Sequence, residues 1–234
     1  YGEFYGFSED PKISEEDFVE KQRLSLIDRI NRVPVPWEDT GKMDAGTAFN
    51  EVVDCIVLNK KSDRMNIWSE SGAVMARYNE RTFIFPVSLC REFAAYYRGA
   101  IPQVYTEAIL PTQYGNVLLY GYIDILMPAS VHDIKTASKY SAGKYRRNWQ
   151  HIVYPYCLNQ SGNSVRDFEY NIAVLTGAVG TYTEYYGYTP ERDVPRLTEC
   201  VEGLIDFILL HGDLITDKKI FNRHTQNDKH GDSK

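Results

Sequence analysis

The chain has 234 residues, of which 43% are hydrophobic and 25% charged, with a formal net charge of −6. It carries no secretory signal peptide and no apolar run near the ~18 residues that span a bilayer, so we expect a soluble, cytoplasmic protein without membrane contact. Its four cysteines are scattered without a Cys-x-x-Cys pair, which argues against a zinc ribbon or a local iron–sulfur clip.

Three helices are expected in the first hundred residues. Ser14-Glu-Glu-Asp17 is typical of a capping box, and the helix it starts ends before the prolines of segment 33–36. A second helix begins near Asp44 and has an apolar face. Residues 59–81 are polar and receive no assignment. Pro86 indicates the first turn of a third helix that ends at Gly99.

Strands are expected from Pro102 onward. Three β-rich runs, over 104–110, 117–127 and 130–136, are separated by turn residues and predict an antiparallel meander. A helix over 145–159, strands over 168–175 and 181–188, and a last helix from Thr189 follow.

This order of elements predicts an α/β fold with a central mixed β-sheet, containing the antiparallel meander and flanked by helices on both sides. We expect a single domain over residues 1–216, with an N-terminal helical extension over about 1–40. Residues 217–234 are expected to form a polar, flexible tail.

Two acids and a lysine interrupt strongly apolar strands in the segment 121–136. Asp124 stands between two isoleucines on one expected strand, and Asp133 and Lys135 stand on the next. A short turn between the strands would bring Asp124 near Asp133. Because side chains alternate along a strand, Asp133 and Lys135 point to the same face.

Charges in such strands are costly to bury without a partner. A divalent cation supplies one, because the two carboxylates and the backbone carbonyl of Ile134 form a hard oxygen site suited to Mg²⁺ or Mn²⁺. Lys135 would then orient or help deprotonate a metal-bound water and stabilise phosphate charge. The alternative is an ordinary strand ion pair between Lys135 and Asp133 or Asp124.

Charge is unevenly distributed along the chain. Residues 1–44 hold eleven acids against six bases, whereas residues 134–166 hold no acid. The bases of that second segment are Lys135, Lys139, Lys144, Arg146, Arg147 and Arg166. A local positive stripe can bind phosphates in an acidic protein; the alternative is a solvated basic face. The 18 tyrosines suit either half-buried core positions or stacking on nucleic-acid bases, and their number does not choose.

Taken together, these residues resemble the signature of the PD-(D/E)XK nuclease superfamily, in particular its RecB-like branch. Asp124 followed by Asp133-Ile-Lys135 is similar to the core pattern, and Gly121 precedes it in the G-x-x-D manner. The segment 150–154 matches the Q-x-x-x-Y helix motif of the branch, and the segment 46–51 resembles its opening motif. The matches occur in family order over 46–154, nearly half of the chain.

The resemblance implies a further metal ligand on the first helix of the core. A histidine often fills that position, and Asn50 stands there in this chain. Glu51 is the neighbouring candidate, because a related pattern in the superfamily uses a glutamate from this helix. Since the two side chains diverge by about 100° around the helix, we expect only one to reach the site.

The resemblance also implies residues that contact or support DNA. Gln150 and Tyr154, four residues apart, would share a helix face with Arg147 and touch the DNA backbone or a base; a polar edge packed against the sheet is the alternative. Lys139 lies in the basic stripe that would guide the strand. Glu107 resembles a glutamate on the branch's first strand, and an exposed strand glutamate is the alternative reading.

We therefore expect a Mg²⁺- or Mn²⁺-dependent deoxyribonuclease with a restriction-endonuclease-like core. The resemblance implies exonuclease action on DNA in recombination, repair or phage DNA processing, a recombination or annealing protein as partner, and the cytoplasm of a bacterial or phage-infected cell.

Two other hypotheses stay open. The first is a catalytically inactive DNA-binding or assembly protein on the same fold, which Asn50 favours and the retained Asp124, Asp133 and Lys135 disfavour. The second is an unrelated protein whose Asp-x-Lys is a strand ion pair.

Overall fold

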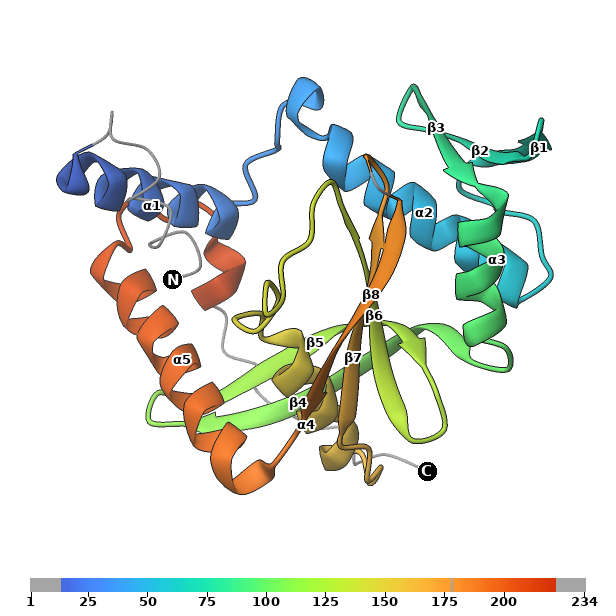
Figure 1. Ribbon diagram of the computed structural model, residues 1–234. Helices are drawn as coiled ribbons and strands as arrows, with labels where there is room; N and C mark the ends of the chain where they lie inside the picture. The colour runs from blue at the N-terminus through green and yellow to red at the C-terminus, as the bar shows by residue number, and fades with distance from the viewer. Residues whose placement is uncertain (1–13, 178, 222–234) are drawn as a thin grey trace, which may run out of the picture. The chain divides into compact units, whose positions relative to one another are not determined.

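A computed structural model describes residues 14–177 and 179–221 (Figure 1). Its helices are α1 (Glu15–Ile30), η2 (Trp37–Asp39), α2 (Gly41–Val57), α3 (Val87–Tyr96), α4 (Gln150–Gln160), α5 (Pro190–Leu210) and η3 (Lys218–Phe221). Its strands are β1 (Asn66–Glu70), β2 (Ala73–Tyr78), β3 (Arg81–Pro86), β4 (Ile101–Thr112), β5 (Gly115–Leu126), β6 (Ser130–Ala137), β7 (Asp167–Val174) and β8 (Gly180–Gly187).

The larger sheet has five strands in the order β4-β5-β6-β7-β8. Strand β6 runs antiparallel to β5 and parallel to β7, and β8 returns antiparallel to β7, so the sheet is mixed. The predicted α/β class, with an antiparallel meander inside a mixed sheet, is confirmed.

A second, three-stranded antiparallel sheet, β1-β2-β3, occupies the polar region that the sequence left unassigned. Its strands are short and turn tightly at Ser71-Gly72 and Asn79-Glu80, all four with positive φ. Such two-residue turns suit the twist of paired strands. The buried side chains of this sheet are few, which explains why no clear period-2 pattern is visible in the sequence.

The chain forms two compact units. The sheet unit comprises residues 35–108 and 119–197, and the helical unit comprises residues 1–34, 109–118 and 198–234. The extension expected over about 1–40 is thus divided between them after Pro34. The described part of the helical unit ends at Phe221, so most of the expected tail, 222–234, lies outside the described residues.

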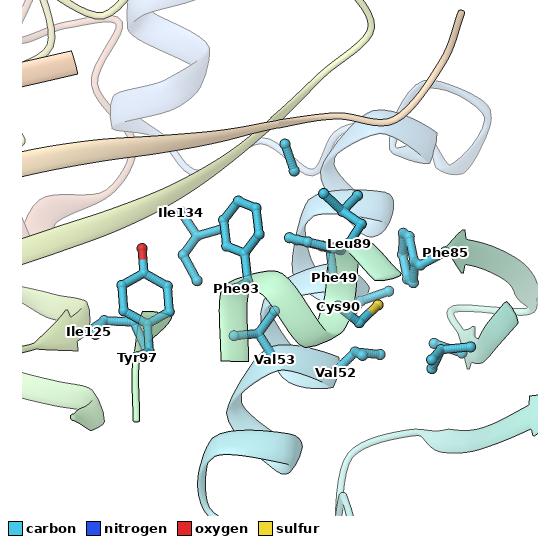
Figure 2. Packing of buried hydrophobic residues seen from close by; sticks show 14 of the residues in the cluster. Phe49, Val52, Val53, Phe85, Leu89, Cys90, Phe93, Tyr97, Ile125 and Ile134 are labelled. Atoms are coloured by element: carbon cyan, nitrogen blue, oxygen red, sulfur yellow. The ribbon is translucent and has the colours of Figure 1, made fainter. Parts of the chain in front are cut away.

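Helices cover both faces of the large sheet within the sheet unit. Figure 2 shows side chains of α2 and α3 converging, with Phe49 edge-on to Phe85 and Phe93 at centroid distances of 5.3 and 5.2 Å. This cluster reaches the sheet at Ile134. Helix α4 places Leu158 in a second cluster with alternate residues of β7, so it lies on the opposite face.

Hydrogen bonds of Asn31 connect the two ends of the helical unit. Helix α1 starts as predicted, with the Ser14 hydroxyl accepting the Asp17 N–H. At its other end Asn31 donates to the Leu214 carbonyl at 2.9 Å and accepts the Thr216 N–H at 2.7 Å. Among the described helices none combines the length and the apolar character needed to cross a bilayer.

Replacing Asn31 with alanine should loosen the helical unit, because one side chain satisfies backbone groups of a segment far away in sequence. We expect a loss of about 1–3 kcal/mol in local stability, typical of leaving such groups unpaired. Hydrogen–deuterium exchange of segment 210–217 measures it, with Asn163→Ala as the control for a surface asparagine. Unchanged protection in Asn31→Ala would refute this role.

Candidate active site

Strands β5 and β6 bring the two predicted aspartates together. The strands pair at Ile125↔His132 and Leu126↔Val131, and the next position on each strand holds Asp124 and Asp133. The carboxylate of Asp124 accepts the backbone N–H of Ile134 at 3.0 Å, which ties it across to β6. Asp124 is half-buried, whereas Asp133 is only 1% exposed.

The side chains of Asp133, Lys135 and Gln150 form a closed triangle of contacts. The Lys135 ammonium lies 2.7 Å from Asp133 Oδ2 and donates to Gln150 Oε1 at 2.8 Å. The amide nitrogen of Gln150 in turn donates to Asp133 Oδ1. Lys135 keeps 24% of its side chain exposed. The arrangement therefore fixes a cation beside a buried carboxylate and leaves part of it accessible.

Helix α4 begins at Gln150, five residues later than predicted. The residues before it form consecutive turns, with N–H groups bonding to carbonyls three residues back and Gly143 at φ +77°. Arg147 lies in these turns, so the prediction that it shares a helix face with Gln150 and Tyr154 is wrong. Arg147 and Lys139 are both exposed in the segment 138–149 that leads into α4.

Tyr154 supports Gln150 from one turn further along α4. Burial raises the pKa of the Tyr154 hydroxyl, and the neighbouring Gln150 side chain acts to lower it. The Tyr154 ring lies directly on Gly121 of β5, where an added Cβ would meet Tyr154 Cε1 at 2.8 Å. No side chain larger than hydrogen fits at that position without moving the ring. This close approach gives the glycine of the G-x-x-D pattern a physical reason.

Gly121→Ala should therefore displace Tyr154 and loosen Gln150 and Lys135. We expect a loss of stability of about 1–3 kcal/mol, the usual range for overpacking. Chemical denaturation measures it, and Gly180→Ala, with open space around the new methyl group, is the control. Equal stability of Gly121→Ala and wild type would contradict the packing argument.

Of the two candidates on the first core helix, Asn50 is the one at the site. Its amide nitrogen donates to Asp124 Oδ2 at 3.2 Å. Glu51 instead accepts the Ser62 hydroxyl at 2.7 Å and pairs with Arg64 at 3.4 Å. The rotation between neighbouring residues on a helix accounts for the difference. Glu51 thus anchors the segment after α2 and is not a neighbour of Asp124.

Asp54 is a residue that the sequence analysis missed. It follows Asn50 by four residues on α2, is 4% exposed, and accepts the Gln103 amide of β4 at 3.0 Å. Burial raises its pKa from 3.8 to about 6, which the Gln103 hydrogen bond opposes. An acid flanked in the sequence by Val53 and Cys55 within an apolar stretch of the helix is the signal that could reveal it.

Burial and mutual repulsion govern the charge state of the aspartate pair. Burial and the nearby charge of Asp133 raise the pKa of Asp124, while the Ile134 N–H and Lys135 oppose the rise. Burial also raises the pKa of Asp133, against the opposing effects of Lys135 and Gln150. Two such carboxylates are stabilised in their charged form by a further cation.

Two buried oxygens without hydrogen-bond partners lie near the aspartates. They are Asn50 Oδ1 and Asp54 Oδ1, one turn apart on α2. Asp133 Oδ2, by contrast, has the Lys135 ammonium as its partner at 2.7 Å. Buried polar atoms in folded proteins are normally satisfied, so each such exception points to strain, chemistry or an absent ion.

The residues present fit a magnesium-type ion better than a zinc-type one. Among the described residues no three His, Cys, Asp or Glu side chains are close enough to hold a metal by themselves. Mg²⁺ is usually held by one or two carboxylates plus waters and substrate phosphates. Asp124 and Asp133 meet that need, with the Asn50 oxygen and the Ile134 carbonyl as neutral additions.

Glu107 lies outside the triangle, on β4. It is exposed and accepts the Tyr105 hydroxyl at 2.5 Å. The partner of Glu107 is therefore Tyr105 on its own strand, and Glu107 is not a member of the triangle formed by Asp133, Lys135 and Gln150.

A cavity of about 380 Å³ lies between α3, β7 and β8, apart from the aspartates. It is lined by Glu92, Phe93, Tyr96, Asn171, Thr181, Tyr182, Thr183 and Tyr185. Several of its polar groups are already bonded: Tyr96 donates to Glu169, Thr181 donates to Glu92, and Asn171 donates to Thr183. The aspartate site is the better functional candidate because its polar groups are incompletely satisfied.

Comparison with known proteins adds little. No family model and no curated protein matches this chain. Among solved structures, the crystal structure of SSO0001 is similar over 53% of this chain and 56% of that chain, with 17% sequence identity and a TM-score of 0.36. The similarity spans little more than half of either chain, and an overlap this weak indicates neither family nor activity.

Proposed function

We propose that this chain is a Mg²⁺- or Mn²⁺-dependent deoxyribonuclease of the PD-(D/E)XK type that hydrolyses DNA phosphodiester bonds. The observation that carries the proposal is the cluster of Asp124, Asp133 and Lys135, closed by Gln150 and bordered by the unsatisfied Asn50 oxygen. Three charged groups at the meeting point of two strands are expensive to keep without a function.

Each residue of the cluster has a task in this chemistry. Asp124 and Asp133 would hold the cation, which when bound polarises the phosphate and activates water. Lys135, positioned by Asp133 and Gln150, would donate to a phosphate oxygen or to the attacking water. The exposed Lys139 and Arg147 would contact phosphates further along the strand.

Exonuclease action in recombination, repair or phage DNA processing completes the proposal, together with a cytoplasmic location in a bacterial or phage-infected cell and a recombination or annealing protein as partner. The support for these features is the resemblance of segment 46–154 to the RecB-like branch. An exonuclease of this kind would begin to degrade DNA at its ends.

A second candidate is a DNA-binding or assembly protein without turnover. The observation that favours it is the Asn50 amide, which donates to Asp124 Oδ2 together with the Ile134 N–H. In that arrangement two hydrogen-bond donors already satisfy this carboxylate oxygen. Lys135 paired with Asp133 would then serve stability alone.

Digestion of end-labelled linear and circular DNA, single- and double-stranded, separates these functions. Wild type should degrade DNA with Mg²⁺ or Mn²⁺ and not with EDTA, and sparing of circles would identify an exonuclease. Lys135→Ala should lose cleavage, whereas Lys42→Ala, an exposed lysine at the start of α2, should keep it. DNA binding without cleavage by any metal would favour the second candidate.

A further inference from the structure

Three exposed tyrosines form a surface on neighbouring strands of the sheet unit. Tyr105 of β4 and Tyr120 and Tyr122 of β5 are 47%, 60% and 59% exposed. The Tyr105 ring lies 5.3 Å from Tyr122 and 6.4 Å from Tyr120, tilted by 59° and 38°. Their ring faces are therefore not covered by one another. We call these three residues the tyrosine surface.

The tyrosine surface leads along β5 toward the aspartate site. Tyr120 and Tyr122 are alternate, exposed residues on one side of β5, and Asp124 follows two residues after Tyr122. Gly121, between them, points the other way, toward Tyr154. Each step of two residues advances about 6.8 Å along the strand. A polymer with its reacting group at Asp124 could thus lie along this row of rings.

Strand β4 also reaches α2 close to the tyrosines. Gln103, two residues before Tyr105, donates its side-chain amide to Asp54 of α2 at 3.0 Å. This end of β4 therefore lies beside the helix that carries Asn50. Two adjacent strands lead from the tyrosines to the same place.

The charge around the tyrosine surface determines whether the bases or the phosphates of a nucleic acid can bind there. Segments 103–107 and 119–126 contain no lysine or arginine. The carboxylate of Glu107 accepts the Tyr105 hydroxyl. Such a surface repels phosphates and offers flat faces on which bases stack. Phosphates would instead find cations in the segment 138–149.

We infer that the tyrosine surface is a stacking platform for unpaired bases of single-stranded DNA next to the bond to be cleaved. The inference rests on the proposed function and names its substrate class. Paired bases of a duplex present their edges and cover their faces, so only a single strand, an overhang or a frayed end can use the platform.

The test is equilibrium binding of a fluorescent single-stranded oligonucleotide and of its duplex, with Ca²⁺ or EDTA in place of Mg²⁺. Tyr105→Ala/Tyr120→Ala/Tyr122→Ala should bind the single strand at least about 10-fold more weakly, and the duplex within twofold of wild type. The corresponding triple phenylalanine variant should bind like wild type. Tyr185→Ala, a 72% exposed tyrosine on β8, is the matched control.

Photochemical crosslinking with bromodeoxyuridine-substituted strands adds a readout that does not depend on affinity. Crosslinks should map to peptides carrying Tyr105, Tyr120 or Tyr122. An RNA oligonucleotide of the same sequence shows whether the platform distinguishes the sugar. Circular dichroism establishes that each variant is folded.

Two results would overturn the platform: wild type that does not bind single strands, or a triple alanine variant that binds them as wild type does. A change only in oligomeric state would make the surface a contact between copies of this chain. If wild type cleaves DNA and the triple alanine variant binds single strands as wild type does, the platform is refuted and the nuclease proposal is not. Tyrosine-dependent binding without cleavage under any metal refutes catalysis alone.

Discussion

Asp133→Asn is expected to reduce metal-dependent cleavage at least about 100-fold while the protein stays folded, because losses of 10- to 100-fold already follow when only a supporting partner of a metal ligand is removed. Asparagine keeps the shape of the side chain and can still accept the Gln150 amide. It removes the charge that pairs with Lys135 and that would bind the cation in the proposed site. The rate of digestion at saturating Mg²⁺ and the unfolding midpoint are the two measurements.

Asp193→Asn is the matched control for this substitution. Asp193 is also 1% exposed, but it pairs with Arg192 at 2.7 Å and Arg196 at 3.4 Å. Burial acts to raise its pKa, yet the Arg192 hydrogen bond and the Thr189 N–H lower it overall. The control should therefore lose stability and keep cleavage per folded molecule. Cleavage at the wild-type rate by Asp133→Asn would remove Asp133 from the active site.

Asp54→Asn should make the protein more stable at neutral pH. Its folded-state pKa of about 6 lies above the ordinary value of 3.8, because burial disfavours the charged form. The protonated group thus contributes stability below pH 3.8 that is lost as pH rises through 6. At 1.36 kcal/mol per pKa unit the lost contribution is at most about 3 kcal/mol. Unfolding free energies measured from about pH 3.5 to about pH 8 should diverge between wild type and variant up to about pH 6.

Asp44→Asn, on the same helix α2, should make the protein less stable at neutral pH. A hydrogen bond from Thr40, together with Asn79 and Arg81 and against the effect of burial, lowers the pKa of Asp44. Its charged form therefore stabilises the fold above the unfolded-state pKa, and that contribution is lost as pH falls through the folded-state value.

Parallel stability curves for Asp54→Asn and wild type would show that Asp54 is not protonated by burial.

The sequence by itself determined the type of most elements and the meeting of Asp124 with Asp133. Only nine positions separate the two aspartates. A short connection between adjacent strands leaves little freedom in their pairing, and strand alternation then settles the side on which Lys135 lies. Local periodicity contains this information, so the mixed sheet and its flanking helices could be predicted.

Tertiary structure alone decided which distant side chains complete the site. The rotation of α2 against the sheet selects Asn50 over Glu51 and turns Asp54 toward Gln103, a residue 49 positions away. The close approach of Tyr154 to Gly121 likewise depends on how α4 packs across β5. Periodic patterns in the sequence also do not reveal two other features. One is the series of turns before α4, which contains Arg147, and the other is the small sheet β1-β2-β3. Helix rotation and packing distance arise from contacts between segments far apart in sequence, and no local pattern records them.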